Sequence, residues 1–362
     1  MSERGTFGFV LHPLDKLDVA RKYPIARLLP ERWVEWLLSH KGPMRVSHIS
    51  GVRGAAGAEA EGWFVGVPLT ARQQIEGDVG YVTRRIIETI RVLERETPAK
   101  IVGLGAYTAV VGDAGKTIQE HVGLAVTTGN SYTVATGVEG ALLAAEQVGI
   151  DRAAARAGVM GATGSIGRVS AMLLSEAVPS LVLIGRDERR LQAVLDDLPG
   201  SAAASISTDA DAALPDCDIV ITVTSALDAV VHPHHLKRGA VVCDISRPRD
   251  VSRAVARQRP DVLVIEGGVV ETPGSVDFGF DFGFPPRTCY ACMAETMVLA
   301  LERRYESFSL GRRLDYDKVK EIDALARKHG FRLAGFRSFE KQVSDEQIAR
   351  VRAARQRVPV AA

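Results

Sequence analysis

The sequence has few cysteines, no long apolar run and almost no net charge, and each absence excludes a class of protein. Four cysteines in 362 residues are too few for a disulfide framework. No apolar stretch reaches membrane-spanning length, and the N-terminus shows no basic segment followed by an apolar one, so we expect a cytoplasmic protein without a secretory signal. A net charge of +1 gives no general attraction to nucleic acid or to a membrane.

What remains is an ordinary globular composition, with 46% apolar and 25% charged residues. A chain of this length is expected to form two domains, and there are enough apolar residues for two cores. Up to about residue 150, short strands alternate with helical stretches. The helical stretches include 30–38 and 75–96, and the strands include 7–10, 46–49, 61–67 and 101–104.

The segment 122–133 is a predicted strand that ends in hydroxyl and amide side chains before a helix over 134–148. Asn130, Ser131 and Thr133 lie in that turn. Strand-to-helix turns place such groups at the edge of a sheet where α/β proteins bind ligands, although a turn followed by a helix cap explains the same residues.

Residues 155–275 alternate near-continuous apolar runs with helices, which predicts a Rossmann-type, doubly wound parallel sheet covered on both faces. The predicted strands are 157–161, 181–185, 203–206, 218–223, 240–244 and 262–265. A glycine loop follows the first of them and opens a helix, as a dinucleotide-binding turn requires. The predicted cofactor contacts in this loop are Gly161, Thr163, Gly164, Ser165, Ile166 and Gly167.

The end of the second strand predicts which nucleotide binds. Arg186 and Arg189 favour the 2′-phosphate of NADP, because a guanidinium matches phosphate in charge and geometry, and Asp187 is the predicted cap of the next helix. The alternative is that Arg189 and Arg190 only form the solvent-exposed face of that helix. Further along, Thr224, Ser225 and Gly267 are predicted to line the cofactor pocket, together with residues 244–248.

Cys292 is predicted in the first turns of a helix that follows Pro285 and Pro286 and continues through Leu301 and Tyr305. Free N–H groups and the positive end of the helix dipole favour a thiolate there, so Cys292 is a candidate nucleophile. A small buried apolar residue is the alternative role. Glu295, one turn further on the same face, could relay a proton or pair with a basic neighbour.

Together these segments resemble the cyanobacterial-type long-chain acyl-[acyl-carrier-protein] reductases. The most specific matches are the threonine–asparagine segment 127–133 and Ala291-Cys292-Met293-Ala294-Glu295, and the resemblance runs from about Phe7 to Phe331. It implies three parts: an N-terminal α/β domain over residues 1–150 that binds the acyl substrate, an NADP-binding Rossmann domain over 151–275, and a C-terminal helical segment over 276–362 that carries the cysteine and packs on both domains.

The resemblance further implies NADPH-dependent reduction of a long-chain acyl thioester to a fatty aldehyde, with the acyl group carried by Cys292. Helix N–H groups, Asn130, Ser131 or Thr133 would then bind the oxyanion. It implies acylated carrier protein or acyl-CoA as the substrate and an aldehyde-consuming enzyme as a possible partner. An acidic carrier would meet a basic patch, for which Arg84-Arg85, Arg303-Arg304 and Arg312-Arg313 are candidates. No metal is expected.

Three other functions fit parts of the sequence. One is an NADP reductase of a small polar substrate, with the layout of shikimate dehydrogenase or glutamyl-tRNA reductase. Another is a short-chain-dehydrogenase-like enzyme, because Tyr316 and Lys320 have the Tyr-x-x-x-Lys spacing, although they follow the nucleotide segment. The third is a non-enzymatic redox sensor that uses Cys289 and Cys292. A zinc site of all four cysteines lacks paired spacing.

Overall fold

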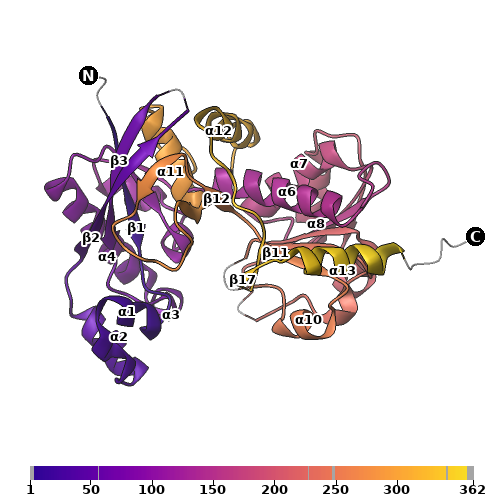
Figure 1. The fold of residues 1–362 in the computed structure, drawn as a ribbon, viewed down its shortest axis with the longest axis horizontal. Helices are drawn as coiled ribbons and strands as arrows, with labels where there is room; N and C mark the ends of the chain where they lie inside the picture. The colour runs from indigo at the N-terminus through magenta and orange to yellow at the C-terminus, as the bar shows by residue number, and fades with distance from the viewer. Residues whose placement is uncertain (1–3, 56, 227, 247–248, 340, 357–362) are drawn as a thin grey trace, which may run out of the picture. The chain divides into compact units, whose positions relative to one another are not determined.

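The computed structural model describes residues 4–55, 57–226, 228–246, 249–339 and 341–356. The chain forms two compact units (Figure 1). The first unit consists of Met1–Tyr132, Val270–Arg313 and Lys320–Arg332, and the second unit of Thr133–Val269, Leu314–Val319 and Leu333–Ala362. These divisions differ from the predicted boundaries at residues 150 and 275, and the C-terminal residues are shared between the units instead of forming a third part.

A six-stranded mixed sheet is the frame of the first unit, in the order β13-β2-β3-β1-β4-β5. β3, β1, β4 and β5 are parallel, whereas β2 and β13 are antiparallel to their neighbours. Its strands are β1 (Gly5–Leu11), β2 (Met44–Arg53), β3 (Glu59–Gly66), β4 (Ile101–Leu104), β5 (Ala125–Thr127) and β13 (Gly274–Asp277). Its helices are α1 (Lys16–Lys22), η1 (Pro24–Arg27), α2 (Glu31–Ser39), α3 (Ala71–Glu76), α4 (Val79–Glu96), η2 (Ala106–Ala109), α5 (Lys116–His121) and α11 (Ala291–Leu301).

Two helices cover opposite faces of this sheet, as the alternation along β1 shows. A Cβ at Gly8 would lie 2.0 Å from the Leu93 side chain of α4, whereas a Cβ at Gly5 would lie 2.0 Å from the Ala300 carbonyl of α11. Successive residues of a strand point to opposite faces, and these two glycines are an odd number of residues apart. The glycines therefore let both helices approach the sheet closely, and α11 with its cysteine is fixed against it.

The second unit contains a six-stranded sheet in the order β11-β10-β9-β6-β7-β8, with every pair parallel. This confirms the predicted Rossmann-type doubly wound fold, because the order reverses at the neighbours β6 and β9. Its strands are β6 (Arg156–Met160), β7 (Ser180–Ile184), β8 (Ala203–Ser207), β9 (Ile219–Thr222), β10 (Val241–Asp244) and β11 (Leu263–Glu266). Its helices are α7 (Ser165–Ala177), α8 (Glu188–Asp196), α9 (Ala210–Ala213), η3 (Leu214–Asp216), η4 (Pro233–His235), α10 (Arg253–Gln258) and α13 (Asp345–Gln356).

The remaining elements are α6 (Asn130–Gln147), β12 (Val269–Glu271), β14 (Thr288–Tyr290), α12 (Tyr316–His329), β15 (Arg332–Leu333), β16 (Arg337–Ser338) and β17 (Lys341–Gln342). β14, β12 and β15 form a three-stranded sheet, and β16 pairs with β17. Among the described residues, none of the helices combines the length and hydropathy that crossing a membrane requires.

Several predicted element boundaries were wrong. The single helix expected over residues 75–96 is two helices, because Gly77 follows α3 and Asp78 caps α4 by accepting the Tyr81 N–H at 2.7 Å. The Cys292 helix ends at Leu301, before Tyr305. The last helix, α13, buries Val351 and Ala354.

Candidate functional site

Cys292 is the second residue of α11, as predicted, and it is the one cysteine among the described residues whose side chain is not fully buried. Backbone N–H groups of Met293, of Ala106 and of Cys292 itself act on its sulfur. Ala106 comes from the turn after β4 and has φ of +47°, a left-handed conformation that costs energy for a residue with a Cβ. This strained turn therefore presents a donor to the thiol from a segment far away in the sequence.

The turn before α6 also lies against Cys292. Gly129 has φ of +71°, and a Cβ there would lie 2.3 Å from the Cys292 Cα. No side chain can be accommodated at that distance, so glycine is required. The structure thus brings together two of the predicted motifs, the segment 127–133 and the cysteine helix.

Glu295 is fully buried and holds the same turn. Its carboxylate accepts hydrogen bonds from the Thr127 hydroxyl at 2.5 Å and from the Tyr132 N–H at 2.9 Å. Burial raises the pKa of Glu295, while these hydrogen bonds lower it less strongly. Glu295 therefore positions residues 127–132 around Cys292.

The predicted hydroxyl and amide groups have different environments. The Ser131 hydroxyl lies 2.6 Å from that of Ser309 and is buried, so it is already hydrogen-bonded within the unit. Thr133 lies one turn further along α6, and the Thr136 hydroxyl donates to its carbonyl at 3.3 Å. Asn130 is half-buried at the start of α6, and its side chain makes no hydrogen bond to any residue that the structure describes. Of the three, Asn130 has an amide available to a ligand.

The expected low pKa of Cys292 is contradicted by its surroundings. Burial raises the pKa of the thiol to about 12, the nearby Glu295 carboxylate raises it further, and the three N–H groups only partly oppose this. The helix terminus was correctly predicted, but the packing of Gly129 and Ala106 over the sulfur was not visible in the local sequence. Burial also raises the pKa of the neighbouring Cys289.

His12 is a site residue that the sequence reasoning missed. Its Nε2 accepts the Tyr107 N–H at 3.3 Å, so Nδ1 carries the hydrogen and bonds the Pro13 carbonyl at 3.1 Å. Burial lowers the pKa of His12 to about 4, and the ring is therefore neutral. It supports the turn that contains Ala106. The signal was its place directly after β1, since the carboxyl ends of parallel strands carry functional residues.

The second unit has the features of a dinucleotide site at the point where its strand order reverses. A Cβ at Gly161 would lie 2.3 Å from the Val223 carbonyl, and one at Gly167 would lie 2.2 Å from the Gly161 carbonyl. The glycines thus allow the loop after β6 to pass close to β9. α7 follows with Gly164 as its cap and no capping side chain, which leaves the N–H groups of Ser165 and Ile166 available to a pyrophosphate.

Arg186 and Arg189 are exposed beyond β7 and form no ion pair with a described residue. Arg190 donates to the Thr163 carbonyl of the glycine loop at 3.2 Å, and Asp187 caps α8, as predicted.

A buried aspartate, Asp250, organises the turn after β9. It accepts hydrogen bonds from the Thr222 hydroxyl at 2.6 Å, the Thr224 N–H at 2.7 Å and the Ser246 hydroxyl at 2.5 Å. The Thr224 hydroxyl also bonds Asp250, so this predicted cofactor contact is engaged internally. Ser225 follows Thr224 in this turn, and a Cβ at Gly267 would lie 2.8 Å from Ile245. Residues 247–248 of the predicted pocket segment 244–248 lie outside the described residues.

A histidine–aspartate cluster is formed by residues of α9 and η4. The Nε2 atoms of His234 and His235 lie 2.9 and 2.8 Å from the same Asp211 oxygen, close enough together for a metal ion. However, the Nδ1 of His235 accepts the His232 N–H at 3.1 Å, so its Nε2 carries the hydrogen and has no lone pair for a metal. The cluster is explained by hydrogen bonding alone.

Comparisons with known proteins agree with the nucleotide site. A family model described as Shikimate / quinate 5-dehydrogenase matches residues 142–266. The chain is 31% identical to Aminotransferase PigE of Serratia sp. over 94% of this chain and 41% of that protein, and 32% identical to the long-chain acyl-[acyl-carrier-protein] reductase of Synechococcus elongatus over 57% of this chain and 61% of that protein. It therefore spans less than two thirds of either relative.

Among solved structures, glutamyl-tRNA reductase from Methanopyrus kandleri is similar with 18% identity and a TM-score of 0.32, covering 60% of this chain and 43% of that one. The chain has the fold and sequence features of a nicotinamide-nucleotide-binding protein, carried by its Rossmann-type unit.

Proposed function

We propose that this protein reduces a long-chain acyl thioester to a fatty aldehyde with NADPH, through an acyl group carried by Cys292. The observation that carries the proposal is the setting of Cys292 at the start of α11, where the N–H groups of Ala106 and Met293 act on its sulfur and Gly129 lies against it. The sequence similarity to the acyl-[acyl-carrier-protein] reductase supports the same substrate class.

In the first step the sulfur of Cys292 attacks the thioester carbonyl carbon. A carbon–sulfur bond to Cys292 forms, the bond to the carrier sulfur breaks, and the proton of the Cys292 thiol leaves with the carrier thiol. One thioester replaces another, so the step is nearly balanced in free energy. The N–H groups that act on the sulfur, with the free Asn130 amide, are candidate donors to the carbonyl oxygen as it gains charge.

Bound NADPH supplies the hydride for the second step. With that hydride on the acyl carbonyl carbon, the carbon–sulfur bond to Cys292 would break, the aldehyde would leave, and the Cys292 thiolate would regain a proton from solvent. Gly161, Thr163, Gly164, Ser165, Ile166 and Gly167 would hold the pyrophosphate, Arg186 and Arg189 the 2′-phosphate, and the turn with Thr224, Ser225 and Gly267 the nicotinamide half. The first unit, which contains Cys292, would hold the acyl group.

Acylated carrier protein or acyl-CoA is the proposed substrate. Of the arginine pairs considered for carrier binding, Arg85 bonds Glu88 and Arg304 bonds Glu306 and Glu321, whereas Arg84 and Arg313 form no ion pair with a described residue. The last two are the better candidates for meeting an acidic carrier.

A comparison of two single variants tests the function. With a long-chain acyl thioester and NADPH, Cys292→Ala should lose aldehyde formation, whereas Cys289→Ala should retain most of it. Aldehyde is measured by gas chromatography and NADPH by absorbance. Equal activity of Cys292→Ala and wild type would exclude the acyl-cysteine route and favour a reductase of a small polar substrate. Loss of aldehyde formation in both variants would favour a redox function that uses the thiols of both Cys289 and Cys292.

A further inference from the structure

The helices between β1 and β2 expose an unusual amount of apolar surface. We call residues 14–41 the helical lobe; it contains α1, η1 and α2. Its own small core consists of Val19, Ala20, Ala26 and Val34, with Leu29 and Leu38 packed against it. Most of the exposed large apolar side chains of the described residues lie in this lobe: Leu14, Leu17, Tyr23, Ile25, Leu28, Trp33, Trp36 and Leu37.

α2 shows the pattern most clearly. Trp33, Trp36 and Leu37 are 62%, 56% and 49% exposed, and their spacing of three and four residues places them on one face of the helix. The opposite side buries Glu35, a charged residue. Val34 and Leu38 of this helix pack inward, so Trp33, Trp36 and Leu37 form a second apolar face that is exposed, which is typical of a surface that meets a partner.

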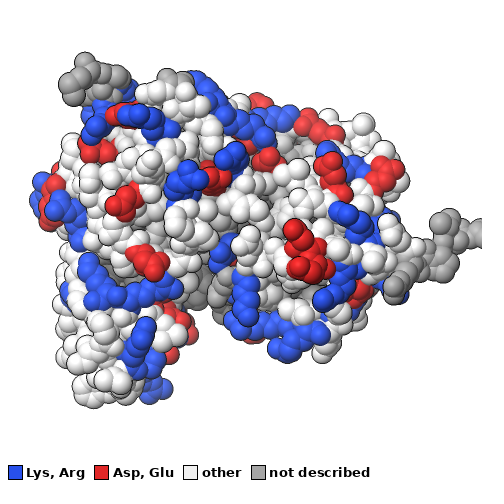
Figure 2. All heavy atoms as spheres, viewed as in Figure 1, with Lys and Arg blue, Asp and Glu red and all other residues white. Residues whose placement is uncertain are grey.

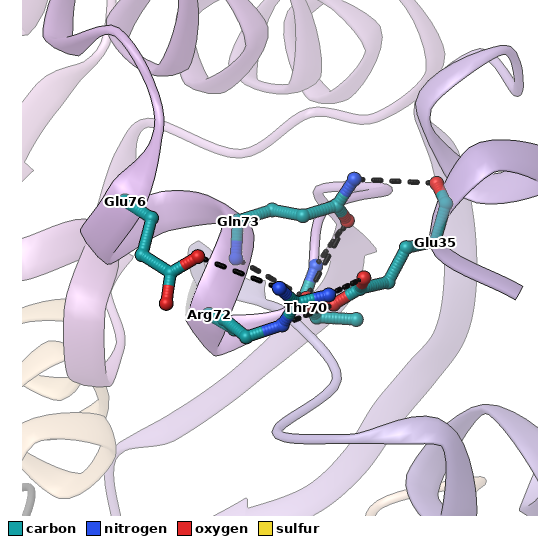
Figure 3. A network of polar contacts seen from close by, with 5 residues as sticks. All are labelled: Glu35, Thr70, Arg72, Gln73 and Glu76. Atoms are coloured by element: carbon teal, nitrogen blue, oxygen red, sulfur yellow. Dashed lines mark hydrogen bonds and ion pairs between the residues drawn. The ribbon is translucent and has the colours of Figure 1, made fainter. Parts of the chain in front are cut away.

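The outward face of α2 is fixed by a polar network (Figure 3). The Glu35 carboxylate pairs with Arg72 of α3 and accepts the Thr70 hydroxyl at 2.9 Å, and Gln73 donates to the Glu35 carbonyl at 3.2 Å. Arg72 also pairs with Glu76. Because α2 is held through its only buried carboxylate, it cannot rotate its tryptophans inward without breaking this network.

The charges of the lobe favour an anionic partner. Lys22, Arg27 and Arg32 are exposed and form no ion pair with a described residue, whereas the exposed Glu31 carboxylate interacts electrostatically with Arg72. The other acidic side chains are engaged: Asp15 caps α1, Asp18 pairs with Arg21, and Glu35 with Arg72. Figure 2 shows the lobe, at the lower left, as largely uncharged surface with Lys and Arg beside it.

We propose that the helical lobe docks on an anionic lipid surface. Trp33, Trp36 and Leu28 would enter the boundary between headgroups and acyl chains, and Arg27 and Arg32 would meet lipid phosphates. Tryptophan rings prefer this boundary, and basic residues beside an apolar helix face are the pattern of interfacial binding. A second copy of the chain fits less well, because two such faces would bring like charges together.

Vesicle binding of the full chain tests the proposal. We expect sedimentation with phosphatidylcholine vesicles that contain phosphatidylglycerol, and little with phosphatidylcholine alone. Trp33→Ser/Trp36→Ser should weaken binding at least about tenfold, because each ring loses apolar burial. Arg27→Glu/Arg32→Glu should remove the preference for anionic vesicles. Val110→Ser is the matched control, since Val110 is 56% exposed outside the lobe.

Tryptophan fluorescence gives a second readout. The chain has three tryptophans, and Trp63, 8% exposed, is already buried. Emission should shift to the blue on anionic vesicles, and the shift should disappear in Trp33→Phe/Trp36→Phe. Two results would overturn the proposal: no binding of wild type to anionic vesicles, or wild-type binding by the serine and glutamate variants. A dimer in gel filtration that Trp33→Ser/Trp36→Ser abolishes, without vesicle binding, would assign the face to a second copy. Circular dichroism melts establish that each variant is folded.

Discussion

At the residue scale, two opposing effects act on Cys292. Backbone N–H groups at the start of α11 and from Ala106 stabilise the thiolate, and burial beside Glu295 destabilises it. Burial is the larger effect, so the resting group is a thiol. The sequence predicted the residue and its helix position, but its pKa depends on Gly129 and Ala106, which only the fold brings to the sulfur.

The reactivity of Cys292 should therefore depend steeply on pH. In the Cys289→Ala variant, alkylation of Cys292 by iodoacetamide should accelerate about tenfold for each pH unit, because the thiolate fraction grows tenfold per unit below the pKa. The rate is followed by mass spectrometry, with Cys289→Ala/Cys292→Ala as the control. A rate that levels off near neutral pH would show that the thiol pKa is low.

Gly129→Ala should destabilise the first unit by more than the left-handed backbone alone explains. The conformation costs about 1–2 kcal/mol for alanine, and the new Cβ would also collide with Cys292. Gly335→Ala is the matched control, because Gly335 has φ of +81° with no atom within 4 Å of its Cβ. Free energies of unfolding from urea titration compare the two. Equal losses of unfolding free energy in the two variants would show that a Cβ at position 129 does not collide with Cys292.

At the element scale, both the cysteine site and the nucleotide site lie where a strand ends or a helix begins. The spacing of apolar residues and the composition of each segment predicted most strands and helices. The parallel strands were predicted because strands buried on both faces are near-continuous apolar runs. The break between α3 and α4 was missed, because Ile75 and Val79 keep the spacing of a helix across Gly77 and Asp78. The roles of Asp250 and His12 were also missed, because each depends on a partner turn that the sequence does not place beside it.

The start of α3 gives a test of capping. Thr70 accepts the Gln73 N–H and donates to Glu35, so Thr70→Ala should cost about 1–2 kcal/mol of unfolding free energy. Thr70→Ser retains the hydroxyl and should lose much less. Urea unfolding measures both, and a serine variant as unstable as the alanine variant would indicate packing of the threonine methyl group instead of capping.

The turn after β7 gives a test of nucleotide choice. Arg186→Ala/Arg189→Ala should raise the KM for NADPH about ten- to a hundredfold and change that for NADH little, because only NADPH carries the 2′-phosphate. Arg253→Ala, an exposed arginine on α10, is the control. An equal rise for both nucleotides would contradict recognition of the 2′-phosphate by these arginines.

At the scale of the whole molecule, the chain does not divide into consecutive domains. Val270–Arg313, with Cys292, joins residues 1–132 in the first unit, and Leu333–Ala362 joins the second. Local patterns predicted the Rossmann-type sheet, but they could not assign these C-terminal segments. Such assignments depend on contacts between residues more than a hundred positions apart in the sequence, for example Thr127 with Glu295.

The central claim, that Cys292 carries the acyl group that NADPH then reduces, is tested most directly by intact-protein mass spectrometry. Wild type mixed with a long-chain acyl thioester should gain one acyl mass without NADPH, and addition of NADPH should release that mass as aldehyde. Cys292→Ala should gain nothing, while Cys289→Ala should behave as wild type. The absence of an adduct in wild type, with NADPH still bound, would contradict the account.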